Sequence, residues 1–126
     1  MEERSCNVTK LVFVLVVSGP LQGHKYFVIS DTPILIGRSN EAIIRINYDD
    51  FCSRKHALLY WENKTCFIKD LDSTNGTFVN NDRISQKTEL HDGDIIGLGD
   101  TKLAVSVKDI NEGNKATSED DISYED

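Results

Sequence analysis

Cysteine is scarce in the 126-residue sequence, and its arrangement suits neither a disulfide framework nor a metal site. The three cysteines, Cys6, Cys52 and Cys66, are an odd number and form no Cys-x-x-Cys pair. Because disulfide frameworks use cysteines in pairs and metal sites use them in clusters, we expect free thiols in a reducing compartment. The sequence therefore predicts an intracellular protein, cytoplasmic or, in a eukaryote, nuclear, with no metal or other cofactor.

Long apolar runs are also missing. The longest, "LVFVLVV" at residues 11–17, has seven residues, whereas a membrane-spanning helix needs about 20. The preceding "MEERS" is not the basic start of a signal peptide, and the following "SGP" is typical of a turn. We therefore expect no membrane partner, and we interpret the run as a buried strand.

Basic clusters are absent as well. The formal net charge is −7, and residues 109–126 hold seven acidic residues and one lysine, which leaves −1 for the rest of the chain. Nucleic-acid binding requires a broad basic surface, so we expect no direct nucleic-acid partner.

Residues 109–126 also have few large apolar side chains to offset the entropy of ordering, which predicts an acidic, disordered tail.

Helical periodicity is nearly absent, whereas β-branched and aromatic runs alternate with turns rich in Gly, Pro, Asn and Asp. After a short N-terminal segment at 1–9, this pattern predicts one all-β domain at 10–108. Many short strands without crossover helices favour a β-sandwich of two twisted, mainly antiparallel sheets. We expect eleven strands, at 10–17, 25–30, 33–36, 43–46, 57–61, 65–69, 77–79, 82–84, 87–90, 94–98 and 102–108.

Enzyme chemistry has little support in the sequence. The three histidines lie in separate contexts, no nucleophile is paired with a base, and the carboxylates lack metal-ligand spacing. We therefore expect a binding protein and no enzyme.

Polar residues that a turn does not need occur in "IKDLDSTNGTFVN", residues 68–80. Asn75-Gly76 is the strongest short-range signal for a hairpin turn, but such a turn has no use for Ser73 and Thr74. Two hydroxyls and a carboxamide side by side are an array of hydrogen-bonding groups for a ligand. The stretch is thus either a turn or a site.

Two other loops contain groups that suit the same ligand. "IGRSN" has Arg38 directly after a predicted strand, and "CSRKHA" has Ser53, Arg54 and Lys55 directly before one. Guanidinium groups supplemented by hydroxyl and amide donors bind phosphate well. Each motif by itself is typical of an ordinary turn or strand start, so their order and spacing carry the signal.

The motifs "IGR", "SRKHA", "IKDLDSTNGTFVN" and "LHDGDIIGLG" occur in this order over about residues 10–108, and this series resembles the forkhead-associated (FHA) domain. The resemblance implies a phosphothreonine-peptide-binding β-sandwich of eleven strands, in agreement with the eleven apolar runs. Two glycines and a histidine, Gly37, Gly76 and His56, resemble residues that support the loops of the family.

The resemblance also implies roles for five binding residues. Arg38 resembles the arginine that holds the phosphate, and Ser53 resembles the serine whose hydroxyl and amide bind phosphate oxygens. Arg54 lies at the adjacent, variable contact position. Thr74 matches the residue that contacts the phosphothreonine, and Asn75 matches the asparagine that hydrogen-bonds the peptide backbone.

Selectivity in the family depends largely on the residue three places after the phosphothreonine. The candidate reading positions are "NYDDFC" at 47–52, which includes Phe51, and "NNDR" at 80–83. Asp49 and Asp50 would disfavour an acidic peptide residue, whereas Arg83 would favour one. The sequence leaves both options open.

We interpret the chain as an adaptor that binds phosphothreonine proteins made by an upstream Ser/Thr kinase. One alternative is a phosphorylation-independent scaffold that uses a sheet face. Another is self-regulation, because Thr117 in "KATSEDD" is followed by acidic residues that suit an acidophilic kinase. Phosphorylated Thr117 would then occupy the binding site of its own or a neighbouring chain, unless the tail is only a solvated acidic segment.

Overall fold

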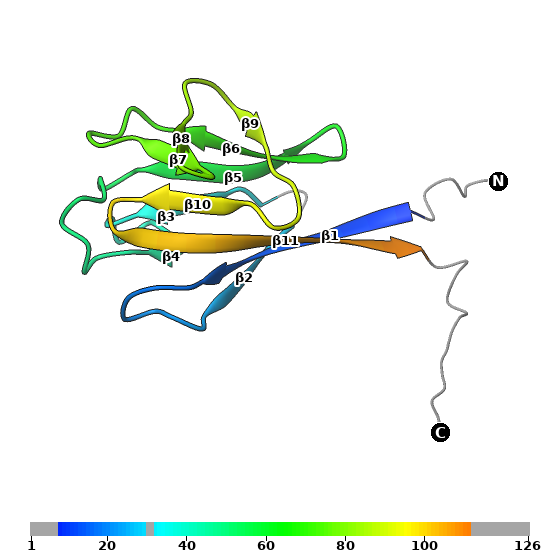
Figure 1. The fold of residues 1–126 in the computed structure, drawn as a ribbon, viewed down its shortest axis with the longest axis horizontal. Coiled ribbons are helices and arrows are strands. Elements are labelled where there is room, and N and C mark those ends of the chain that lie inside the picture. The colour runs from blue at the N-terminus through cyan, green and yellow to red at the C-terminus, as the bar shows by residue number, and fades with distance from the viewer. Residues whose placement is uncertain (1–7, 30–31, 112–126) are drawn as a thin grey trace. The chain divides into compact units, whose positions relative to one another are not determined.

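A computed structural model describes residues 8–29 and 32–111, and the regular structure in these ranges consists of β-strands, without a helix. Each of the eleven predicted runs overlaps one strand, which confirms the predicted fold (Figure 1). The strands are β1 (Val8–Val16), β2 (Lys25–Val28), β3 (Ile34–Gly37), β4 (Ile44–Arg45), β5 (Ala57–Glu62), β6 (Thr65–Asp70), β7 (Thr77–Val79), β8 (Asp82–Arg83), β9 (Thr88–Glu89), β10 (Ile95–Leu98) and β11 (Thr101–Asn111).

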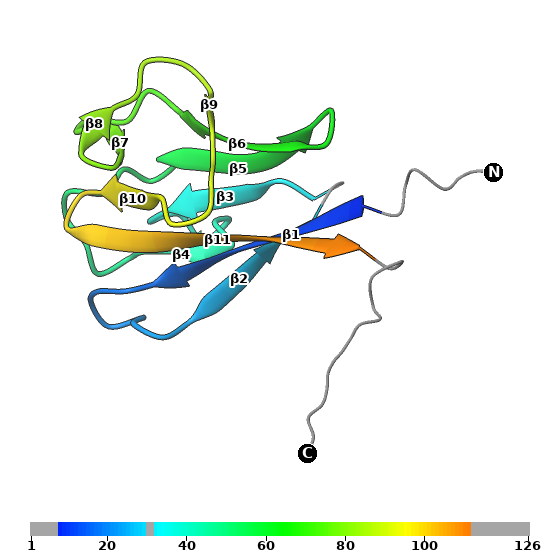
Figure 2. The same ribbon diagram turned by 45° about the vertical axis from the view of Figure 1, so that its right-hand side comes forward.

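The strands form two sheets. A six-stranded sheet has the order β2-β1-β11-β10-β7-β8, and a five-stranded sheet has the order β4-β3-β5-β6-β9. The pairings whose register the structure describes are antiparallel, except that β3 and β4 are parallel, with Ile36 beside Ile44. Figure 2 shows β3, β5 and β6 as neighbours in the smaller sheet.

The core lies between the sheets in the compact unit that spans Val12–Val107. Fully burying a Val, Leu or Ile side chain stabilises a fold by about 1.5–3 kcal/mol, so this core dominates the folding energy. Trp61 of β5 donates a hydrogen bond of 2.7 Å from its indole nitrogen to the Val28 carbonyl of β2, which links the two sheets. The most completely buried aliphatic side chains are Val12, Val14, Val16, Ile36, Ile44, Ile46, Leu59, Ile68, Ile96, Leu98 and Leu103.

The apolar run at 11–17 is buried on one face only. Val12, Val14 and Val16 are buried, whereas Phe13 and Leu15 are partly exposed on the opposite face of β1. The prediction of a buried strand is therefore wrong for half of its side chains, because strand residues alternate between two faces and one sheet covers only one of them. Phe13 instead packs against Phe27, with ring centroids 5.4 Å apart.

Strand structure extends beyond both predicted domain limits. β1 begins at Val8, before the predicted start at 10, and β11 continues to Asn111, past 108. β1 and β11 are hydrogen-bonded neighbours, and main-chain pairing extends a strand without large apolar side chains. The remainder of the predicted tail, 112–126, lies outside the described residues. Within the described part, the structure contains no helix that is long and apolar enough to cross a membrane.

The "STNG" segment is not a hairpin turn. It follows β6 of the five-stranded sheet and precedes β7 of the six-stranded sheet, so it crosses between the sheets. Its Asn75 lacks the positive φ that a hairpin turn of this type needs. Two other pairs have that conformation: Asn63 and Lys64 between β5 and β6, and Asn80 and Asn81 between β7 and β8.

The buried thiols give a first prediction. Burial raises the pKa of both Cys52 and Cys66 to about 12; nearby Asp49 adds to the shift at Cys52, and Arg38 opposes it. Since the thiolate is the reactive form, neither cysteine should react with Ellman's reagent at pH 8 in the folded protein. In a Cys6→Ser variant both should react once urea unfolds the chain. Rapid reaction of either thiol before unfolding would contradict this result.

Candidate functional site

The register of the five-stranded sheet places three loops at the same end of its strands. Ile36, Ala57 and Asp70 are paired in one row across β3, β5 and β6. Because β5 runs antiparallel to its two neighbours, the residues that follow β3, precede β5 and follow β6 leave the sheet at the same end of the strands. The loops with the predicted phosphate-binding groups therefore meet there (Figure 2). We name them the first loop (38–43), the second loop (46–56) and the third loop (71–76).

Gly37 and Arg38 attach the first loop to the second. The Arg38 amide donates to the Ser53 carbonyl at 3.1 Å, and its Nε donates to the Cys52 carbonyl at 2.6 Å. The two Nη atoms make no hydrogen bond or ion pair with the residues that the structure describes. A Cβ on Gly37 would lie 2.0 Å from the Arg54 carbonyl oxygen, so only glycine permits this close approach of the two loops.

His56 is fully buried and connects the second loop to the third. Its Nδ1 accepts the Ser53 amide at 3.0 Å, so its proton is on Nε2, which donates to the Gly76 carbonyl at 2.8 Å. The Ser53 amide thus has a partner within the protein, and its predicted contact with a phosphate oxygen stays a prediction. The Ser53 hydroxyl accepts the Thr74 amide at 3.0 Å and keeps its own proton for another acceptor.

Asp70 organises the third loop and was not identified from the sequence. Its carboxylate accepts hydrogen bonds from the amide and hydroxyl of Ser73 and from the Thr77 hydroxyl. Burial by itself raises the pKa of Asp70, but these hydrogen bonds outweigh it, and the net result is a lowered pKa. An Asp three residues before a Ser is a local signal of such a turn, which the sequence contained.

Ser73 is part of this internal network. It is 8% exposed, and its hydroxyl also accepts the Gly76 amide at 2.9 Å. The expectation that Ser73 contributes a hydrogen bond to a ligand is therefore wrong, because both functions of its hydroxyl are used inside the loop. Thr74 and Asn75, in contrast, are exposed.

Asn75 makes a further link between the third loop and the second loop, in addition to the one through His56. Its Nδ2 donates to the Phe51 carbonyl at 2.9 Å. The remaining Nδ2 proton and the Oδ1 atom are thus the groups that can still serve a ligand. Phe51 itself is 56% exposed.

Arg54 and Arg83 lie at the border of the site. Arg54 is exposed next to Ser53, and Arg83 of β8 is exposed beside the third loop. A Cβ on Gly76 would lie 2.6 Å from the Arg83 Nε, and Gly76 has a φ of +92°, so both space and backbone favour glycine there. Lys55 is exposed and lies 3.6 Å from the Glu41 carboxylate.

Asp49 is a structural residue. It is 5% exposed, and its carboxylate accepts the amides of Phe51 and Asp100 and the hydroxyl of Thr101. These three bonds hold the carboxylate beside the β10–β11 turn, and its predicted effect on acidic peptide residues stays a prediction. Asp50, next to it, is exposed.

A recess of about 230 Å³ adjoins the loops, and we name it the near recess. Its lining includes Phe51 and Asn75, which the sequence indicated as a selectivity position and a peptide-binding residue. It also includes Phe78 of β7, which the sequence pattern had assigned only to a strand. The signal for Phe78 was absent because an aromatic residue in a strand is ordinary. The near recess is lined by Phe51, Asn75, Phe78, Gly99 and Asp100.

Other predicted features fall outside what the structure tests. In the part of the chain that it describes, no group of His, Cys, Asp or Glu side chains could hold a metal ion. Thr117 lies outside the described residues and stays a prediction.

Asp70→Asn tests how the carboxylate holds the third loop. We expect it to lower the free energy of unfolding at pH 7 by about 1–3 kcal/mol, because an amide nitrogen replaces an acceptor oxygen. Since the folded-state pKa is lowered, the stabilisation is complete above the ordinary value of 3.8 and is lost as the pH falls through the folded-state value. Urea unfolding should therefore show that the difference between the two proteins shrinks below pH 3.8.

Asp72→Asn is the matched control. Asp72 is exposed, and its φ of 55° suits asparagine as well as aspartate. A constant difference between Asp70→Asn and the unmodified protein at all pH values would contradict the assigned role.

Comparison with known proteins agrees with this arrangement. The sequence model of the FHA domain matches residues 34–99, more than half of the chain. FHA domain-containing protein FhaA of Mycobacterium tuberculosis (strain ATCC 25618 / H37Rv) is 41% identical over 71 residues, which covers 56% of this chain and 13% of FhaA. The chain thus spans only a small part of that relative's length.

Solved structures with the same fold include two FHA domains with at least 30% identity. One, from a structural and functional analysis of phosphothreonine-dependent FHA domain interactions, is 34% identical with a TM-score of 0.68, over 76% of this chain and 95% of that one. The kinase-interacting FHA domain of the kinase associated protein phosphatase KAPP of Arabidopsis is 30% identical with a TM-score of 0.73, over 82% and 98%. The chain belongs to the FHA domain family.

Proposed function

We propose that the chain is a phosphothreonine-binding module that acts as an adaptor in kinase signalling. The observation that carries the proposal is the meeting of Arg38, Ser53 and Thr74 on three adjacent loops. The similar FHA domains support it, since one was analysed for phosphothreonine-dependent interactions and another interacts with a kinase. The partner is a protein phosphorylated on threonine by an upstream Ser/Thr kinase.

The donors of the three loops suit a phosphate group. Phosphothreonine carries close to two negative charges and has three strong acceptor oxygens. The two Nη atoms of Arg38 offer a fork of donors for two of these oxygens, and the Ser53 hydroxyl offers a third hydrogen bond. The Thr74 hydroxyl and the Arg54 side chain add a further donor and a second positive charge at the border.

Asn75 binds the peptide main chain in this proposal. Its Oδ1 accepts a peptide N–H, and the Nδ2 proton that Phe51 does not use donates to a peptide carbonyl. Because Asn75 is already held by the second loop, little side-chain entropy is lost when the peptide binds.

Phe51 and Arg83 bias the choice of peptide sequence. The exposed Phe51 ring beside the near recess favours an apolar peptide residue, whereas the Arg83 guanidinium favours an acidic one. Asp50, Asp100 of the near recess and the charge of the buried Asp49 oppose an acidic residue. These side chains read the residue three places after the phosphothreonine.

The wider role follows from the same site. The binding module comprises the two sheets from Val8 to Asn111, and Gly37, His56 and Gly76 keep its loops in position. It is a binding module, and the buried His56, with both ring nitrogens engaged by main-chain groups, serves to hold the loops. Its buried free thiols suit a reducing intracellular compartment.

Arg38→Ala tests the proposal directly. Hydrogen bonds to charged groups contribute about 1.5–3 kcal/mol each, so the variant should bind phosphothreonine peptides roughly ten- to more than hundredfold more weakly. Fluorescence anisotropy with an oriented phosphothreonine peptide library measures this effect, with phosphoserine and unmodified peptides alongside. Thermal melting of the variant shows whether it remains folded.

Arg45→Ala is the matched control for charge. Arg45 is exposed on β4 beside Gly37 and donates to Asn40 at 2.6 Å, so this variant removes a positive charge near the first loop without removing a proposed phosphate contact. Equal binding of phosphorylated and unmodified peptides, or full binding by folded Arg38→Ala, would refute the proposal. Partner binding that survives Arg38→Ala would instead favour the phosphorylation-independent scaffold.

A further inference from the structure

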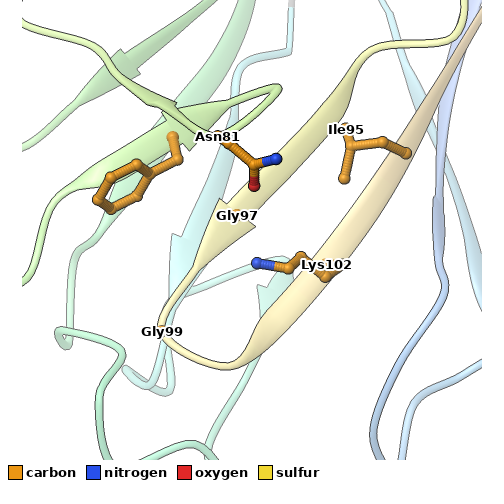
Figure 3. A pocket seen from close by; sticks show the side chains of 6 residues that line it. Asn81, Ile95, Gly97, Gly99 and Lys102 are labelled. Carbon is orange, nitrogen blue, oxygen red and sulfur yellow. The ribbon is translucent and has the colours of Figure 1, made fainter.

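A second recess lies on the outer face of the six-stranded sheet, and we name it the far recess. It has a volume of about 240 Å³. Figure 3 shows Asn81 and Lys102 approaching Gly97 of β10 from opposite sides. The far recess is lined by Phe78, Asn81, Ile95, Gly97, Gly99 and Lys102.

The far recess adjoins the near recess. Phe78 and Gly99 line both, so a peptide that continues from the near recess past these two residues would come to the far one. A Cβ on Gly99 would lie 2.7 Å from both carboxylate oxygens of Asp49. The buried Asp49 carboxylate therefore requires glycine at 99, where the two recesses adjoin.

Gly97 forms the floor of the far recess for a different reason. It lies inside β10, between β7 and β11, and its φ is not in the positive range. Glycine is unfavourable in a strand interior unless another chain or ligand approaches closely. The φ value at 97 does not require glycine, and what glycine provides is room for the Lys102 side chain to lie over the strand beside Phe78.

Lys102 supplies a positive charge over this floor. It pairs with Gly97 across β10 and β11, and its Nζ lies 3.2 Å from the position of a Cβ on Gly97. Lys102 is exposed and forms no ion pair with the residues that the structure describes. Phe78 and Ile95 provide apolar surface, and the Asn81 carboxamide provides a polar group at the opposite side.

We infer that the far recess reads an acidic residue of the bound phosphopeptide, distant from the phosphothreonine. Its carboxylate pairs with the Lys102 ammonium, while its methylene groups lie against Phe78 and Ile95. A glutamate suits this combination, since it has an apolar stem and a charged end. The inference rests on the proposed phosphothreonine binding and adds a second contact along the peptide.

Charge-scanning of phosphopeptides tests the inference. Starting from the best-binding phosphothreonine peptide, each other position is replaced in turn by Glu, Gln or Lys, and affinities are measured by fluorescence anisotropy. We expect one position outside the near recess where Glu binds roughly three- to tenfold more tightly than Lys. This preference should weaken with added salt and fall to twofold or less in Lys102→Gln.

Two further variants separate charge from shape. Lys25→Gln removes a lysine from the same sheet face, on β2 beside Phe13, and should leave the preference unchanged. Gly97→Val fills the floor without changing the net charge and should reduce the preference as Lys102→Gln does. The Lys102 end is flexible and can move aside for the new side chain, so the strand remains intact.

The outcomes distinguish the inference from the proposed function. If phosphothreonine binding is intact but no position prefers Glu, or if the preference survives in Lys102→Gln, the far recess is no reader of acidic residues. If the unmodified protein binds no phosphopeptide, the proposed function fails and the inference fails with it. A preference that Lys102→Gln and Gly97→Val abolish and Lys25→Gln retains establishes the second contact.

Discussion

The bridge through His56 is the interaction on which the arrangement of the binding loops depends. One neutral imidazole accepts the Ser53 amide and donates to the Gly76 carbonyl, so it fixes the second and third loops relative to each other. Both partners are main-chain groups that burial would otherwise leave without a hydrogen bond, which costs about 1–3 kcal/mol for each group. No other neutral side chain offers a donor and an acceptor at opposite ends of a rigid ring.

Two carboxylates, the buried Asp49 and the partly buried Asp70, extend the same principle. Asp70 gathers the donors of the third loop, and Asp49 gathers those of the second loop and the β10–β11 turn. Each replaces the regular hydrogen bonding that a loop lacks, because it accepts several donors at once. Consequently, the loops reach a fixed geometry before any ligand binds, and the entropy of ordering them is spent during folding.

The sequence predicted the number and order of the strands well, because alternation and turn residues are local signals. It also indicated Arg38, Ser53, Thr74 and Asn75. It failed for Ser73 and did not show the structural role of Asp49, because residue type alone does not show whether a polar group faces a ligand or a neighbouring loop. That distinction depends on contacts between segments far apart in the chain, such as Asp49 with Thr101. Phe78 was missed for the same reason, since only the fold places it beside Asn75.

In the proposed complex, affinity and selectivity arise from different physical terms. Arg38 is half-buried and held by the Cys52 carbonyl, so its bonds to a phosphate dianion are charge-assisted and poorly screened. Lys102 and Arg83 are exposed, so their pairs with acidic peptide residues contribute about 1 kcal/mol or less and weaken with salt. Phosphorylation therefore decides whether a peptide binds, and the outer side chains only rank peptides that already carry the phosphate.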